Sequence, residues 1–175
     1  MRPHLKPSHY SLWLMPTGEV RQRLAGTILD LSREYAAPSF EPHVTLASGI
    51  VGPAREVASK MADLARQISP FTVRLTEVDF LDEYFRCLFV RVAMTHPIMK
   101  ANKLARAVFS LAQQPAFMPH LSLLYADLPS GVKDRIVASL AWRFELQFKV
   151  SSLHLYLIKR KVAAWWRVAS FGLGL

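Results

Sequence analysis

Cysteine is nearly missing from this chain, which has Cys87 alone among its 175 residues. One cysteine cannot form an internal disulfide, so nothing in the sequence indicates an oxidising compartment. Cys87 stands in the alternating segment 86–92, and we expect it to be a structural thiol rather than a nucleophile. The chain also has no run of about eighteen apolar residues, and its first residues lack the apolar stretch of a signal peptide. We therefore expect a soluble, cytoplasmic monomer with no membrane partner.

Acidic residues are scarce, at 13 against 22 Lys and Arg, which gives a formal net charge of +9 and a sequence pI near 10.1. This balance favours an anionic partner such as a nucleotide or an RNA end. Apolar residues make up 51% of the chain, which excludes general disorder, and the length suits a single domain over residues 1–175. Because the histidines, Cys87 and the acidic residues show no spacing typical of a zinc site, we expect neither a metal nor a cofactor.

The sequence contains one motif twice. Residues 40–46 read Phe-Glu-Pro-His-Val-Thr-Leu and residues 117–123 read Phe-Met-Pro-His-Leu-Ser-Leu. Proline disfavours helix, and the alternation after it predicts that each copy opens a strand. Since residues i and i+2 of a strand share a face, His43 should lie beside Thr45, and His120 beside Ser122. The alternate positions are apolar and are predicted to face a core: Val44, Leu46, Leu121 and Leu123.

The rest of the chain shows the same order of elements around each motif. Apolar spacing predicts helices over 19–35, 53–68, 97–113 and 132–141, and strands over 8–15, 71–81, 86–94, 143–159 and 163–171 in addition to the two motif strands. Each half then reads as helix, proline loop, histidine strand, helix and a pair of strands, which indicates an internal duplication. We predict a bilobal α+β fold: two lobes related by a pseudo-twofold axis, each with an antiparallel sheet and helices, and a cleft between them that holds both motifs.

Two histidines with hydroxyl neighbours suit the opening of a cyclic phosphodiester. A water must lose a proton as it attacks phosphorus, and the leaving sugar oxygen must gain one on the opposite side. Imidazole titrates near neutral pH and can serve either step. Hydroxyl groups can donate hydrogen bonds to the non-bridging oxygens, where negative charge must be held. This scheme needs no metal.

The paired motifs His43-Val-Thr45 and His120-Leu-Ser122 resemble the His-x-Thr/Ser motifs of the two-histidine phosphoesterase superfamily. The short chain and the distance between the motifs are most similar to the cyclic phosphodiesterase branch known from plants and yeast. That resemblance implies hydrolysis of nucleoside 2′,3′-cyclic phosphates to 2′-phosphates and of ADP-ribose 1″,2″-cyclic phosphate to ADP-ribose 1″-phosphate. The implied partner is a small cyclic-phosphate nucleotide, with RNA 3′ ends as a further candidate.

The same resemblance implies roles for individual residues. His43 and His120 would be the acid–base pair, and Thr45 and Ser122 would hold the phosphate. We favour His120 as the base that activates water and His43 as the acid, although the pseudo-symmetry leaves the reverse order open. Three aromatic residues are expected to contact the base or sugar: Tyr125, Trp13 and Phe85.

Two other functions remain open at this point. Members of the superfamily that process RNA ends, and 2′-5′ RNA ligase-like members, carry the same motifs, so the chain could act on longer RNA. A non-catalytic module that binds RNA or nucleotides could also keep this fold.

Two further polar segments have weaker interpretations. Ser152, His154 and Tyr156 alternate with leucines, and we expect ordinary surface exposure rather than ligand contact. The pair Trp165-Trp166 follows the basic turn 159–161. In an alternating strand we expect one of these rings to face the core and the other to face solvent or a neighbouring strand, so structural packing is favoured over stacking on bases.

Overall fold

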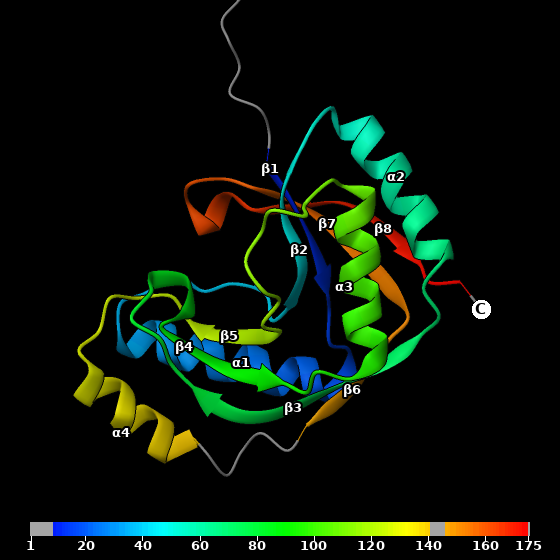
Figure 1. Ribbon diagram of the computed structural model, residues 1–175. Coiled ribbons are helices and arrows are strands. Elements are labelled where there is room, and N and C mark those ends of the chain that lie inside the picture. The colour runs from blue at the N-terminus through cyan, green and yellow to red at the C-terminus, as the bar shows by residue number, and fades with distance from the viewer. Residues whose placement is uncertain (1–8, 141–145, 175) are drawn as a thin grey trace, which may run out of the picture.

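The computed structural model describes residues 9–140 and 146–174 (Figure 1). The strands are β1 (His9–Leu14), β2 (Val44–Val51), β3 (Phe71–Asp79), β4 (Leu88–Val92), β5 (His120–Leu124), β6 (Gln147–Val150), β7 (Ser152–Ile158) and β8 (Trp166–Gly172). The α-helices are α1 (Gly18–Glu34), α2 (Ala54–Arg66), α3 (His96–Val108) and α4 (Ser130–Leu140), and two 3-10 turns are η1 (Tyr84–Arg86) and η3 (Val162–Ala164).

The strands form one sheet in the order β6-β3-β4-β5-β2-β1-β7-β8, and every strand pair in the described ranges is antiparallel. At the centre of the sheet, β2 meets β5 through the pair Val44 and Leu121. Each of these residues directly follows a motif histidine. The sheet therefore brings the two histidines into neighbouring positions, although 76 residues separate them in the chain.

The order of strands is symmetric about that central pair, which agrees with the predicted α+β fold with two related lobes. One lobe contains β2, β1, β7 and β8, and the other contains β5, β4, β3 and β6. The lobes do not correspond to the two halves of the sequence. Strands β3 and β4 of the first predicted half join the lobe of β5, and strands β7 and β8 at the end of the chain join the lobe of β1 and β2. Helices cross between the lobes as well: α1 packs against β5 and α3 against β2, as Figure 1 shows.

The core follows the predicted alternation. Val44, Leu46, Leu121 and Leu123 are all buried in one large apolar cluster. A second, small cluster of Trp13, Met15 and Tyr156 lies apart from it. Cys87 is buried and free, as expected for a structural thiol. None of the helices in the described ranges has the length and apolarity that crossing a bilayer would need.

Two element predictions are wrong in their extent. The helix predicted to reach residue 113 ends at Val108, because Phe109 leaves the helical conformation and Ser110 has a positive φ of 56°. The single strand predicted over 143–159 is two strands with Ser151 between them: β6 pairs with β3 at one end of the sheet, and β7 pairs with β1 in the other lobe. The predicted ends at Ser8, Ala141 and Arg143 lie outside the described residues.

Candidate active site

The motif histidines and hydroxyls line one open pocket of about 340 Å³ at the centre of the sheet. All seven residues predicted for the site border this pocket, which we call the histidine pocket: Trp13, His43, Thr45, Phe85, His120, Ser122 and Tyr125. Strands β1, β2 and β5 carry or directly adjoin most of them, and η1 supplies Phe85. The fold thus places the two halves of the duplication around a single cavity.

Both histidine rings are anchored in the same way. Nδ1 of His43 lies 2.6 Å from the carbonyl oxygen of Glu41, and Nδ1 of His120 lies 2.9 Å from that of Met118. A carbonyl oxygen only accepts hydrogen bonds, so each Nδ1 carries a hydrogen and donates it. In the neutral rings Nε2 is therefore the basic nitrogen, and it is the one left to exchange protons with a ligand.

The two rings differ in their surroundings. His43 is buried and stacks on Trp13, with ring centroids 3.5 Å apart and planes 10° from parallel. The pKa of His43 is lowered to about 4, mainly by burial and in part by the nearby His120, while the hydrogen bond to Glu41 opposes the shift. His120 is only partly buried and meets Phe89 edge-on at 5.2 Å.

The pKa of His120 is also lowered. Burial is the largest cause, and the cations Arg86 and Arg91 add to it. In the free protein, both imidazoles are therefore mainly neutral at pH 7, and His43 resists protonation the more strongly. A bound anion would oppose this effect, because a negative charge favours the imidazolium form.

The two hydroxyl residues occupy equivalent positions on their strands. Thr45 pairs with Trp13 across β2 and β1, and Ser122 pairs with Phe89 across β5 and β4. Ser122 is buried and its Oγ donates to the carbonyl oxygen of Phe85 at 3.2 Å. Thr45 is half-buried. Both hydroxyls lie on the same strand face as their histidine, as the alternation predicts.

Aromatic rings form one wall of the histidine pocket. Tyr125 stacks on Phe40 at 3.9 Å and meets the edge of Phe85 at 5.2 Å. The hydroxyl of Tyr125 hydrogen-bonds to Ser122, and burial raises the pKa of Tyr125, so the phenol stays neutral. Phe85 is half exposed at 51%. This wall offers flat apolar surface next to the hydroxyl of Ser122.

Several residues of the pocket were not predicted as site residues, and two of them bring a large ring and a cation to it. Trp165, expected to pack within the fold, lines the pocket, with its ring centroid 5.9 Å from that of Trp13 and 6.0 Å from that of Tyr125. Arg86 also lines it, held by Glu83 through hydrogen bonds of 2.6–2.9 Å. No sequence pattern points to Trp165, because η3 interrupts the strand alternation just before it. Trp165 packs against the small cluster of Trp13, Met15 and Tyr156, and Trp166 is 51% exposed, so the two rings face opposite ways as predicted.

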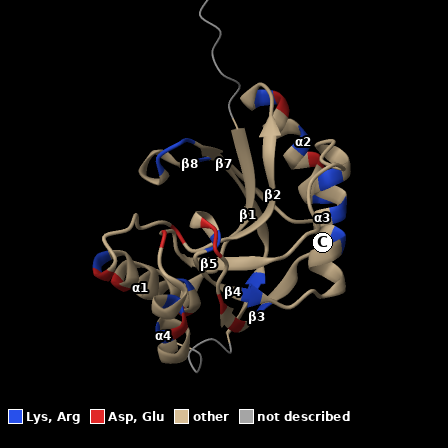
Figure 2. Ribbon diagram, turned by 60° about the vertical axis from the view of Figure 1, so that its left-hand side comes forward, with Lys and Arg blue, Asp and Glu red and all other residues tan. Residues whose placement is uncertain are grey.

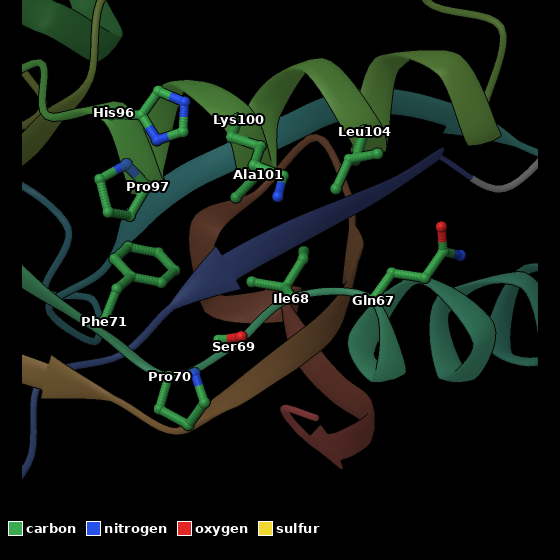
Figure 3. Close-up of a pocket in the computed structure, with 10 residues that line it drawn as sticks. All are labelled: Gln67, Ile68, Ser69, Pro70, Phe71, His96, Pro97, Lys100, Ala101 and Leu104. Atoms are coloured by element: carbon green, nitrogen blue, oxygen red, sulfur yellow. The ribbon is translucent and has the colours of Figure 1, made fainter. Parts of the chain in front are cut away.

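A smaller cavity of about 200 Å³ lies elsewhere, between α3 and the segment that links α2 to β3. Figure 3 shows His96 and Lys100 of α3 above residues Gln67 to Phe71 of that segment. Neither motif contributes to this cavity, so it is not the candidate active site. Within residues 9–140 and 146–174, no cluster of three or more His, Cys, Asp or Glu side chains could hold a metal ion.

Known proteins are similar to this chain in sequence. The family model of the cyclic phosphodiesterase-like protein matches residues 9–173. A cyclic phosphodiesterase of Arabidopsis thaliana is 30% identical over 129 residues, which cover 74% of this chain and 71% of that protein.

Solved structures agree with the fold. Escherichia coli LigT without ligand superposes with a TM-score of 0.64 at 16% identity, over 98% of this chain and all of that one. A protein of Thermus thermophilus gives a TM-score of 0.67 at 19% identity, over 94% of this chain and 97% of that one. The chain therefore belongs to the cyclic phosphodiesterase-like protein family, in the cyclic phosphodiesterase branch of the two-histidine phosphoesterase superfamily.

Proposed function

We propose that this cyclic phosphodiesterase hydrolyses the cyclic phosphate of small nucleotides, without a metal, by an acid–base pair made of His43 and His120. The observation that carries the proposal is the geometry of the pair: both rings border one pocket, and each has Nδ1 tied to a backbone carbonyl so that Nε2 is available. The substrates are nucleoside 2′,3′-cyclic phosphates and ADP-ribose 1″,2″-cyclic phosphate.

The reaction balances without a cofactor. One neutral histidine takes a proton at Nε2 from water as the water oxygen bonds to phosphorus. The bond from phosphorus to one ring oxygen breaks, and the protonated histidine gives that oxygen its proton. For a nucleoside 2′,3′-cyclic phosphate the leaving oxygen is O3′ and the product is the 2′-phosphate. Each turnover exchanges the protonation states of the pair, and proton exchange with solvent restores them.

Thr45 and Ser122 would stabilise the charge on the non-bridging oxygens during this displacement. In the free protein the single hydroxyl hydrogen of Ser122 is donated to the carbonyl oxygen of Phe85, and burial keeps the neighbouring Tyr125 protonated. The Ser122 hydrogen would therefore turn from Phe85 to the phosphate when the substrate binds, and there it would stabilise the developing charge. The rings of Tyr125, Trp13 and Phe85 provide the surface on which a base or sugar packs.

Nucleotide ligands of the structural relatives agree with this substrate class. LigT has been crystallised with phosphate, ATP, NADP+ and 3′-AMP. The relative from Arabidopsis thaliana carries the name cyclic phosphodiesterase. At the identities found for LigT the likeness concerns the fold, so these ligands support nucleotide binding as a class and do not select one substrate.

The order of proton transfer can be separated by experiment. The motif resemblance favours His120 as base and His43 as acid, whereas the lower pKa of His43 in the free protein favours the reverse. An aryl phosphodiester with a p-nitrophenolate leaving group needs no acid. The alanine variant of the acid should therefore hydrolyse this ester at close to the wild-type rate but lose activity on the cyclic nucleotide. The alanine variant of the base should lose activity on both substrates.

Hydrolysis of adenosine 2′,3′-cyclic phosphate in the presence of a chelator tests the proposed function. We expect His43→Ala and His120→Ala each to lower turnover by about 10²–10⁴-fold, the usual contribution of general acid–base catalysis. His96→Ala is the matched control, because this histidine lies in the separate cavity of Figure 3. Full activity in either motif variant, or loss of activity on chelation, would overturn the proposal. Turnover restricted to oligonucleotides would instead favour RNA-end processing, and binding without turnover would favour a recognition module.

A further inference from the structure

A third cavity adjoins the histidine pocket and has no part in the scheme above. It measures about 490 Å³, and we call it the outer pocket. Its lining comes from the β1–α1 connection, the segment before β2, strand β7 and the start of β8. The residues that matter here are Arg21, Glu41, His154, Tyr156, Trp165 and Arg167.

The outer pocket lies next to the histidine pocket, and Trp165 borders both cavities. Stacked rings form the wall between them: Tyr156 stacks on Trp13 at 3.7 Å, and Trp13 stacks on His43 at 3.5 Å. The outer pocket is therefore two ring layers from His43, and a ligand that occupies both cavities would pass over the edge of this wall at Trp165.

The charges around the outer pocket favour an anion. Arg21 and Arg167 both line it and are exposed, whereas the lining has a single carboxylate, Glu41, which lies 3.4 Å from Arg21. The segment between β7 and β8 contains basic residues, coloured blue in Figure 2, and Nζ of Lys159 stands 5.5 Å from the ring of Trp166, which also borders the cavity. Guanidinium groups bind phosphate well because their donors match its oxygens.

His154 also borders the outer pocket. Ser152 Oγ lies 2.9 Å from Nε2 of this ring, while Nδ1 is buried and has no hydrogen-bond partner among the residues that the structure describes. Because Nδ1 is not open to the cavity, we assign His154 no contact with a ligand, and the two arginines carry the recognition of an anion.

We propose that the outer pocket binds a 5′-phosphoryl group on the same ribose that carries the cyclic phosphate. This inference rests on the proposed function, because it places the cyclic phosphate between the two histidines. A ribose with a cyclic phosphate at one end and a phosphoryl group at the other occurs in two kinds of molecule: a pyrophosphate-linked dinucleotide such as ADP-ribose cyclic phosphate, and an RNA 3′ end. Arg21 and Arg167 would hold the phosphoryl group, and Tyr156 and Trp165 would pack against what lies between.

The test compares adenosine 2′,3′-cyclic phosphate with the same compound bearing a 5′-phosphate. In the wild type we expect the 5′-phosphate to raise kcat/KM about tenfold, mainly through KM, as one charge-assisted contact would. Arg167→Ala and the double variant Arg21→Ala/Arg167→Ala should bring the ratio of the two kcat/KM values close to one, and Arg167→Lys should restore part of it. Arg33→Ala, which removes a cation from the far end of α1, should leave the ratio unchanged.

Binding measurements separate this inference from the proposed function. By calorimetry, adenosine 2′,5′-bisphosphate should bind the wild type about tenfold more tightly than adenosine 2′-phosphate, and Arg167→Ala should remove the difference. If neither cyclic phosphate is hydrolysed, the proposed function fails, whatever the binding result. If both are hydrolysed with equal kcat/KM, or if the preference survives in the double variant, the outer pocket is not a 5′-phosphoryl site.

Two further substrates distinguish the source of the phosphoryl group. A gain for ADP-ribose 1″,2″-cyclic phosphate beyond that of the 5′-phosphorylated mononucleotide would identify a pyrophosphate as the natural group. A gain confined to a short oligoribonucleotide that ends in a 2′,3′-cyclic phosphate would identify an RNA 3′ end. In both cases the gain should depend on Arg167, and a gain that is independent of Arg167 and Arg21 would contradict the proposal.

Discussion

The buried state of His43 should make the stability of this protein fall sharply with acid. An ordinary histidine titrates at 6.5, whereas burial lowers the pKa of His43 to about 4. Between those values the unfolded chain binds a proton that the folded protein refuses, so the free energy of unfolding decreases as the pH falls from 6.5 to 4. Each pKa unit corresponds to about 1.4 kcal/mol, so the full loss from this one side chain is roughly 3 kcal/mol.

Urea unfolding of the wild type and of His43→Gln between pH 7.5 and pH 4 measures this loss. Other groups titrate over the same range, so the informative quantity is the difference between the two proteins. The wild type should lose about 3 kcal/mol more than the variant, with nearly all of the difference arising below pH 6.5. His96→Gln should follow the wild type, because that residue lies outside the site. Parallel curves for wild type and His43→Gln would refute the argument that burial keeps this ring neutral.

Three further predictions concern activity. The profile of kcat/KM against pH should be bell-shaped with its maximum below 6.5, because burial lowers the pKa of both histidines in the free protein. The profile of kcat should be shifted to higher pH, because the bound phosphate raises the pKa of the histidines. A flat profile from pH 4 to 9 would contradict paired acid–base action. Ser122→Ala should lower kcat by about 10²–10³-fold, since it removes a donor to the non-bridging oxygens, and an unchanged kcat would exclude that role. Lys133→Met should raise KM and lower the free energy of unfolding in urea by about 1.5–3 kcal/mol. The ammonium group of Lys133, which is 2% exposed, donates to the carbonyl of Leu81 and pairs with the carboxylate of Asp82 at the base of the loop that carries Phe85. An unchanged KM would show that the loop keeps its position without this contact.

The sequence was sufficient to predict the histidine pocket because local and global signals agree there. Proline followed by strict alternation fixes which side chains share a face, and the repeat of that pattern indicates that two such strands are equivalent. The four motif residues and the three predicted aromatic residues accordingly border one cavity. The apolar residues that alternate with the motif histidines and hydroxyls are buried, as predicted.

The remaining features depend on long-range pairing or on single backbone angles, which leave little trace in the sequence. Alternation continues through residues 147–158, so nothing local indicates that the chain leaves β3 at Val150 and joins β1 after Ser151. Helix α3 ends at Val108 and Ser110 has a positive φ, although the apolar spacing of the sequence continues past this point. The lining of the outer pocket comes from four segments that lie far apart in the sequence, and only the folded chain brings Arg21 and Arg167 to one cavity.

The duplicated fold also explains why the two histidines are unlike. An acid–base pair needs one ring protonated while the other is neutral; repulsion between the two rings already separates their titrations, and a difference in surroundings decides which ring holds the proton. The anchoring to a carbonyl is the same in both copies, but the residue opposite the motif hydroxyl differs: Trp13 in β1 covers the face of His43 at 3.5 Å, whereas Phe89 in β4 meets His120 edge-on at 5.2 Å. One substitution between equivalent strands thus leaves His43 more deeply buried, with the larger fall in pKa. In the mechanism proposed above, the duplication would supply two copies of one proton-transfer group, and this difference in aromatic packing would let them act in opposite senses.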